Sequence, residues 1–276
     1  MYNFLKQIIN ILKWLVKIGL NIVGLLILFL AVYNFRLNSF NHKKIIENEQ
    51  YVTYDNFFYI DKSLDSEKYS KIFLASYYQL PPNIQQLIRE RWIFVGKPDI
   101  SGEQEYLEDY IGGIDAEMEV SNDTVGGATD SINKIINIYI KPDADDEIFV
   151  TTIYHEIGHA ISTELGFADM ETSWVNLYSS IEYLSPCTRN IPEYVMANTA
   201  EFFATTFADY ILYGEEISEL YPNIYHYWDN VIPQIEGRPT YWMRLKYSLF
   251  SVANALDELE RNPDFLKGKF KIAGLG

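Results

Sequence analysis

The sequence predicts an α+β fold, mostly helical with a small sheet, behind an N-terminal transmembrane helix. Three observations support this class. Long stretches repeat apolar residues at helical spacing, two short runs are rich in β-branched and aromatic residues, and a long apolar run lies near the N-terminus. The helical stretches are residues 66–78, 83–91, 146–165 and 198–210, and the strand-like runs are residues 92–95 and 132–141.

The apolar run near the start predicts that residues 1–36 are a membrane anchor. Ile18–Tyr33 contains 16 residues, and beginning the run at Trp14 gives the roughly 20 residues that span a bilayer. Ala31-Val32-Tyr33 offers no small-x-small cleavage site, which favours an uncleaved anchor over secretion after signal-peptide cleavage. Basic residues flank the run almost equally and do not fix its orientation. We expect the large acidic part to be extracytoplasmic.

The chain after the anchor is predicted to comprise a polar linker, residues 37–50, and one folded domain, residues 51–276. Residues 51–60 are expected to be irregular or extended. Gly96 and Pro98 are expected to end the strand at 92–95.

The middle of the chain is predicted to carry one strong strand between polar segments. The acidic stretch 101–120 lacks calcium-loop spacing and is expected to be a solvated surface, and the glycine pair in residues 121–130 predicts a loop. The strand at 132–141 is expected either to be a core strand or to offer its edge to an extended peptide. A helix at 241–260 is expected to pack on the domain.

Composition excludes several classes of function. The chain of 276 residues has a net charge of −16, which phosphates would repel, so we expect no nucleic-acid partner. Its single cysteine, Cys187, excludes an internal disulfide and a paired-cysteine metal site.

The helical stretch 146–165 contains the pattern His155-Glu156-Ile157-Gly158-His159. Residues four apart lie on one face of a helix, so both imidazoles can point at one metal ion. Glu156 follows the first histidine and can reach a metal-bound water without being a ligand. This spacing predicts a catalytic Zn²⁺ site, with Glu156 as general base.

The third metal ligand must come from elsewhere in the chain. Ser162 and Leu165 stand where an extended H-E-x-x-H-x-x-G-x-x-H pattern would have its glycine and last histidine. His226 is one candidate, in an aromatic segment that is typical of core packing. Glu201, among Phe202 and Phe203, is the stronger candidate, because a carboxylate buried there needs a partner. Spacing alone also allows Glu201 to face solvent.

These motifs resemble those of the lethal-factor-like zinc metallopeptidases, which include the catalytic domain of anthrax lethal factor and the Pro-Pro endopeptidases. The resemblance rests on His155-Glu156-Ile157-Gly158-His159-Ala160 and on Glu201-Phe202-Phe203-Ala204, about forty residues later. It implies a zincin-like metallopeptidase domain with His155, His159 and Glu201 as zinc ligands. Tyr194, seven residues before Glu201, would hydrogen-bond the oxyanion. Thr205 departs from relatives, which often carry a second acidic residue there.

The sequence therefore predicts a membrane-anchored zinc endopeptidase that acts on peptides or proteins. Two other functions remain open. A binding or immunity protein could use a degenerate protease fold, although such a protein would be expected to have lost Glu156. A zinc hydrolase could instead cleave an amide that is not a peptide bond.

Overall fold

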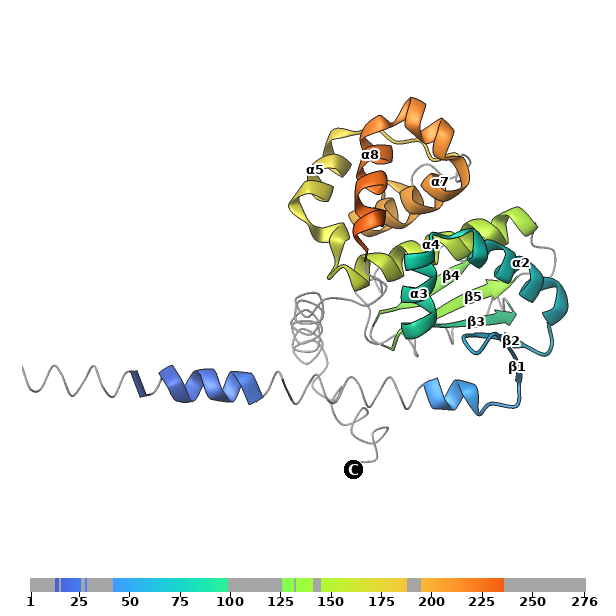
Figure 1. The fold of residues 1–276 in the computed structure, drawn as a ribbon, viewed down its shortest axis with the longest axis horizontal. Coiled ribbons are helices and arrows are strands. Elements are labelled where there is room, and N and C mark those ends of the chain that lie inside the picture. Colours follow the sequence, from blue (N-terminus) through green and yellow to red (C-terminus); the bar gives the residue numbers. More distant parts are fainter. Residues whose placement is uncertain are drawn as a thin grey trace, which may run out of the picture.

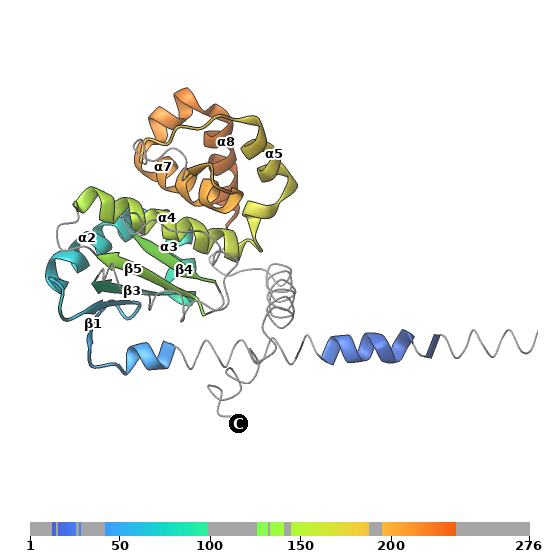
Figure 2. The same cartoon turned by 180° about the vertical axis from the view of Figure 1, so that it is seen from behind.

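The structure is a computed structural model, and it describes residues 13–14, 16–25, 28, 42–98, 126–131, 133–140, 145–187 and 195–235. One long helix, α4 (Asp146–Glu164), lies between two parts of the folded chain. Figure 1 shows a sheet on one side of α4 and helices α5, α7 and α8 on the other, and Figure 2 shows the same order from behind. The predicted α+β class, mostly helical with a small sheet, is confirmed.

Among the described residues, five strands form one mixed sheet in the order β1-β2-β3-β5-β4. Strand β3 is parallel to β2 and to β5, whereas β1 and β4 pair antiparallel at the two edges. Strand β5 is thus internal, and β4 is the edge next to α4. The strands are β1 (Tyr51–Tyr54), β2 (Phe58–Asp61), β3 (Ile93–Pro98), β4 (Gly127–Asp130) and β5 (Ile135–Ile140).

Helices α2, α3 and α4 begin and end close to the predicted positions, because local signals fix them, whereas α7 begins as predicted but extends to Leu220 instead of residue 210. Asp65 caps α2 by accepting a hydrogen bond from the backbone N–H of Lys68 at 3.0 Å, and Pro82 occupies the first turn of α3. The remaining helices are α2 (Ser66–Gln79), α3 (Pro82–Arg91), α5 (Thr172–Ser180), α7 (Thr199–Leu220) and α8 (Pro222–Val231), with short 3₁₀ turns at η2 (Ala168–Met170) and η3 (Ile232–Gln234).

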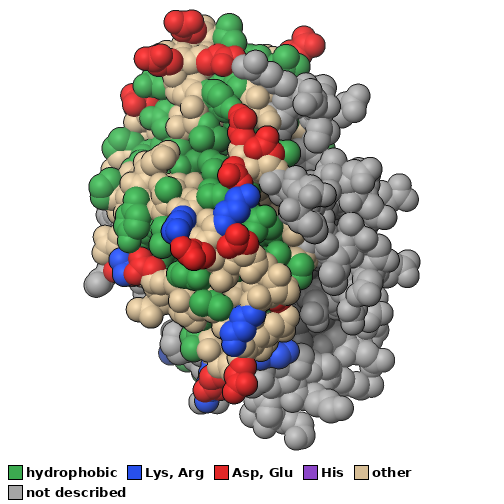
Figure 3. Space-filling model, turned by 90° about the vertical axis from the view of Figure 1, so that its right-hand side faces the viewer, with side chains coloured by type: hydrophobic (Ala, Val, Ile, Leu, Met, Phe, Trp, Pro, Cys, Tyr) green, Lys and Arg blue, Asp and Glu red, His purple; other side chains and the backbone are tan. Residues whose placement is uncertain are grey.

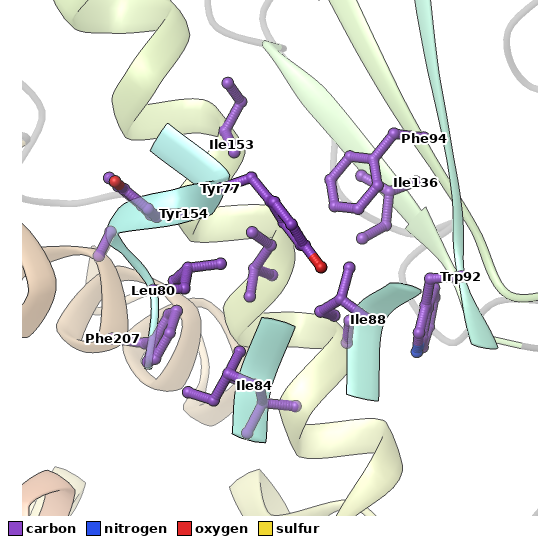
Figure 4. Close-up of a cluster of buried hydrophobic side chains, with 14 of the residues drawn as sticks. Tyr77, Leu80, Ile84, Ile88, Trp92, Phe94, Ile136, Ile153, Tyr154 and Phe207 are labelled. Carbon is purple, nitrogen blue, oxygen red and sulfur yellow. The ribbon is translucent and has the colours of Figure 1, made fainter. Parts of the chain in front are cut away.

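One continuous apolar core joins the sheet to the helices and encloses much of α4. In the view of Figure 4, Phe94 and Ile136 of the sheet lie at one side of this core, Phe207 of α7 lies at the other, and Tyr77 of α2 lies between them. Ile153 of α4 is fully buried in the same cluster. Burial of this apolar surface fixes α4 against both parts of the fold.

A buried polar cluster holds the C-terminal end of α4 to the sheet. The Glu164 carboxylate accepts a hydrogen bond from Trp92 Nε1 at 3.0 Å and lies 2.7 Å from Arg91 Nη1 and 3.1 Å from Lys134 Nζ. Burial and the Arg91 charge lower the pKa of Lys134 to about 8, although Glu164 acts in the opposite direction. Two cations and an indole N–H thus offset the desolvation of one carboxylate.

The opposite face of the sheet has a smaller cluster of Tyr59, Ile93, Val95 and Ile135. Residues 42–46, within the predicted linker, are helical, and Ile45 packs against this cluster. His42 Nε2 lies 2.7 Å from the carbonyl oxygen of Asn133. The chain therefore contacts the sheet from residue 42 onward.

The structure differs from the sequence-based expectations in the strands. Residues 51–60, for which the extended alternative is confirmed, also form an antiparallel hairpin that was not predicted, whose turn places Asp55 and Asn56 at φ of 52° and 61°. Strand β3 does not end at Gly96, because pairing with β5 extends it to Pro98. The prediction of a loop at 121–130 is wrong for residues 127–130, which form strand β4. The expectation that the strand at 132–141 offers a free edge is also wrong, because β4 pairs with β5 along that edge.

Several predicted segments fall wholly or partly outside the described residues. These are the whole acidic stretch 101–120, the whole helix predicted at 241–260 and most of the anchor at 1–36. Within the anchor, residues 16–25 are helical. No helix among the described residues is both long enough and apolar enough to cross a membrane.

Candidate metal centre

Helix α4 presents the two histidines of the motif on one face. His155 is 8% exposed and His159 is half-buried, and their ring centroids are 4.8 Å apart. Their Nε2 atoms approach to 3.1 Å. The i,i+4 spacing therefore brings the two imidazoles together as the sequence predicts.

Local signals set the length of α4. Asp145 caps its N-terminus by accepting a hydrogen bond from the backbone N–H of Glu147 at 3.1 Å. At the other end, Gly166 has a φ of 80°, which favours glycine and ends the helix. The residues of α4 around the motif are largely buried, which excludes an exposed helix with two solvated histidines.

Helix α7 brings Glu201 to the same point. Asn198 caps α7 by accepting hydrogen bonds from the backbone N–H groups of Ala200 and Glu201, both at 2.9 Å. Glu201 is 7% exposed, so it does not face solvent. Its Oε2 lies 3.1 Å from His155 Nε2, and its Oε1 lies 3.6 Å from His159 Nε2. His226, the other candidate ligand, is exposed on α8 and lies outside this group.

A glycine inside the motif allows α4 and α7 to come this close. A Cβ at Gly158 would lie 2.7 Å from Cα of Ala204, 2.9 Å from its carbonyl oxygen and 3.2 Å from its carbonyl carbon. These are backbone atoms, which cannot rotate away. The missing side chain of Gly158 therefore sets the separation of the two helices, and with it the distance from Glu201 to the histidines.

The three side chains fit a tetrahedral zinc site. With metal–ligand bonds of about 2.0–2.1 Å, two corners of a tetrahedron are about 3.3 Å apart. Here the two Nε2 atoms are 3.1 Å apart, and each lies near a different oxygen of Glu201, His155 at 3.1 Å from Oε2 and His159 at 3.6 Å from Oε1. Glu201 Oε2 is buried and makes no hydrogen bond with the described residues. A cation among these atoms would satisfy that oxygen.

The two carboxylates of the centre have different electrostatic environments. Burial alone would raise the pKa of Glu201, but His159 and His155 outweigh burial and hold this pKa well below its usual value. Burial raises the pKa of Glu156, while His159, His155 and the hydroxyl of Thr129 act in the opposite direction. Glu201 is thus suited to remain a charged ligand, and Glu156 is better suited to exchange a proton.

Thr205 contacts the ring nitrogen of His155 that faces away from the metal centre, a role that the sequence analysis did not predict. It lies one turn after Glu201 on α7, and its hydroxyl is 3.2 Å from Nδ1 of His155. An Nδ1–H group that donates to this oxygen leaves the Nε2 lone pair free for a metal. A neutral hydroxyl thus contacts His155 from the position that the sequence analysis identified as a departure from the family pattern.

Tyr194 lies outside the described residues, but the segments on both sides of it are fixed. Val195, the next residue, is buried. Before it, the buried carboxylate of Asp209 on α7 accepts hydrogen bonds from the Tyr183 hydroxyl at 2.7 Å and from the Cys187 backbone N–H at 2.9 Å. These contacts hold residues 183–187 against the helix that carries Glu201.

The fold and the site together define an α+β protein with a candidate His₂Glu metal centre. The chain matches no known protein family and no curated protein. Among solved structures it is similar to the Pro-Pro endopeptidase PPEP-2 from Paenibacillus alvei, with a TM-score of 0.47 and 14% sequence identity over 64% of this chain and 98% of that one. At this TM-score the likeness establishes neither the family nor the activity of this chain.

Proposed function

We propose that this protein is a zinc-dependent endopeptidase held at a membrane by its N-terminal segment. The grouping of His155, His159 and Glu201 beside the buried carboxylate of Glu156 carries this proposal. Two neutral nitrogens and one carboxylate oxygen are a donor set typical of catalytic zinc.

His155, His159 and Glu201 would hold the ion. When bound to such a set, zinc lowers the pKa of a coordinated water to about 7 and polarises a carbonyl. Glu156 accepts the proton of the attacking water and passes it to the leaving amine, a role for which its burial and its raised pKa are suited. Thr205 orients His155 throughout.

Tyr194 is proposed as the hydrogen-bond donor to the developing oxyanion. This assignment rests on its offset from Glu201 in the family that the sequence resembles. One such donor contributes about 3 kcal/mol to transition-state stabilisation.

An extended peptide is the proposed substrate. Strand β4 is an edge strand, and no described strand pairs with its outer side. A peptide that paired with this edge would lie beside Glu156, which contacts Thr129 of β4. Acidic side chains are spread from top to bottom of the face in Figure 3, and the net charge is −16, so we propose no nucleic-acid partner.

The N-terminal segment is proposed as an anchor, with the metal centre outside the cytoplasm. The described part of this segment has strongly exposed apolar side chains, among them Leu20 at 68% and Leu25 at 66%, and a lipid environment would cover them. Carbonate extraction of membranes and the accessibility of a C-terminal tag in intact cells test the proposal. Release of the protein by carbonate would contradict anchoring, and a protected tag would contradict the orientation.

Digestion of a peptide library tests the enzymatic proposal. The full-length protein in detergent is compared with Glu156→Ala, after the zinc content of both has been measured. We expect both proteins to hold one zinc ion and only the wild type to cleave. Cleavage by both would remove Glu156 from the reaction, and a wild-type protein that binds no zinc would refute the metal site.

A further inference from the structure

The carboxylate of Glu156 makes a specific contact with the edge strand of the sheet. Thr129 Oγ1 donates a hydrogen bond to Glu156 Oε2 at 2.6 Å and also lies 3.1 Å from the Glu156 carbonyl oxygen. The short distance to the carboxylate is typical of a charge-assisted hydrogen bond. Glu156 itself is 4% exposed, so little water competes for that oxygen.

Gly127 provides the space that this carboxylate occupies. It lies two residues before Thr129 and therefore on the same face of β4. A Cβ at Gly127 would lie 2.6 Å from Cγ, 2.8 Å from Oε1 and 2.9 Å from Cδ of Glu156. Its φ is outside the left-handed region, so the backbone itself does not demand glycine. Space for Glu156 is the physical reason for a glycine here.

Strand β4 can hold these two groups in place because it is paired along its length. Gly127 is opposite Ile138 and Thr129 is opposite Ile136, and both isoleucines of β5 are fully buried. The strand therefore holds the Thr129 hydroxyl and the space at Gly127 in fixed positions facing α4.

We propose that Thr129 and Gly127 are positioning residues for Glu156. The Thr129 hydroxyl holds one carboxylate oxygen, and Gly127 leaves room for the rest of the carboxyl group, so Glu156 keeps a single orientation beside the His155, His159 and Glu201 group. The inference rests on the proposed function, in which Glu156 transfers the proton. It assigns to β4 a second role, separate from pairing with a substrate.

Four variants of the full-length protein test the proposal. Thr129→Val keeps the shape of the side chain without the hydroxyl, and Thr129→Ser keeps the hydroxyl. Gly127→Ala crowds Glu156. Gly126→Ala is the matched control, because a Cβ at Gly126 would lie equally close, 2.6 Å, to Oγ1 of Thr152 instead.

The first readout separates kcat from KM at equal zinc content. We expect Thr129→Val and Gly127→Ala to lower kcat by about 10–100-fold with little change in KM, since a misplaced catalytic group costs up to about 100-fold. Thr129→Ser and Gly126→Ala should keep kcat within about threefold of wild type. The crowding in Gly127→Ala falls on side-chain atoms of Glu156, from Cγ outward, and on no backbone atom among the nearest three, so the fold should persist.

The second readout is the affinity for acetohydroxamate, measured by calorimetry. This probe chelates zinc and also hydrogen-bonds a carboxyl group beside the metal. We expect about tenfold weaker binding to Thr129→Val and Gly127→Ala, and wild-type binding to Thr129→Ser and Gly126→Ala, following the usual effect of lost outer-sphere support.

The outcomes distinguish the positioning role from the proposed function. Wild-type kcat and wild-type acetohydroxamate affinity in Thr129→Val and Gly127→Ala would overturn the positioning role alone. A wild-type protein that binds zinc but cleaves no peptide would overturn the peptidase, and the acetohydroxamate comparison would still decide the positioning. A wild-type protein without zinc would overturn both.

Discussion

Replacement of Gly158 by alanine tests whether one missing side chain sets the geometry of the metal centre. The new Cβ would lie 2.7 Å from Cα of Ala204, whereas nonbonded carbon atoms are most stable at about 3.5–4.0 Å apart. Helices α4 and α7 would have to separate by about 1 Å, because the atoms in the way are backbone atoms. Glu201, one turn before Ala204, would move away from His155 by a similar distance.

Two energies oppose each other in this variant. Overpacking of a close contact costs about 1–3 kcal/mol, at the upper end where nothing can rotate away. Alanine is favoured over glycine inside a helix by about 1 kcal/mol. We expect the free energy of unfolding to fall by about 1–2 kcal/mol, which corresponds to a Tm lower by about 2–8 °C for a domain of this size. Zinc affinity should fall by about 10–100-fold or more.

Thermal unfolding of the metal-free protein and competition with a chromophoric chelator measure the two effects. Gly214→Ala is the matched control on α7, because a Cβ there would meet only Cε2 of Tyr225, at 4.0 Å. This control should keep wild-type zinc affinity. A Gly158→Ala protein with unchanged Tm and unchanged zinc affinity would refute the role of the close approach.

Three further predictions follow from the same centre. Glu156→Gln should lower kcat by about 10²–10⁴-fold while zinc content stays the same, and a smaller loss would contradict the general-base role. Thr205→Val should weaken zinc binding by about 10–100-fold and Thr205→Ser should restore it; equal affinities would exclude support of His155. Tyr183→Phe should lower the free energy of unfolding in denaturant by about 1–3 kcal/mol, because buried Asp209 loses a donor. Tyr213→Phe removes only an exposed hydrogen bond to Glu147 and should change this free energy little.

The metal-binding pair could be predicted from the sequence because its geometry is local. A spacing of four residues on one helix places His155 and His159 on the same face, independently of the rest of the fold. The role of Glu201 was harder to predict, since its spacing allowed it either to bind the metal or to face solvent. Its burial against α4 decides the matter, and burial depends on how two distant helices pack.

The supporting residues could be predicted only in part. Gly158 gave a signal, because a glycine inside a helix usually has a packing reason. Thr205 could have been found by its position one turn after Glu201. Thr129 gave no signal, because its strand is only four residues long and begins within a glycine pair that is typical of a loop. Pairing with β5 makes it a strand, and short-range patterns do not report that pairing.

The order of the ligands along the chain determines when the centre can form during synthesis. His155 and His159 supply two ligands, and the third, Glu201, comes 42 residues later on a different helix. A growing chain therefore cannot offer all three until α7 has been made. The proposed anchor, residues 1–36, leaves the ribosome long before that point. If the proposed anchor and peptidase activity are correct, the chain would reach its membrane before its metal centre was complete.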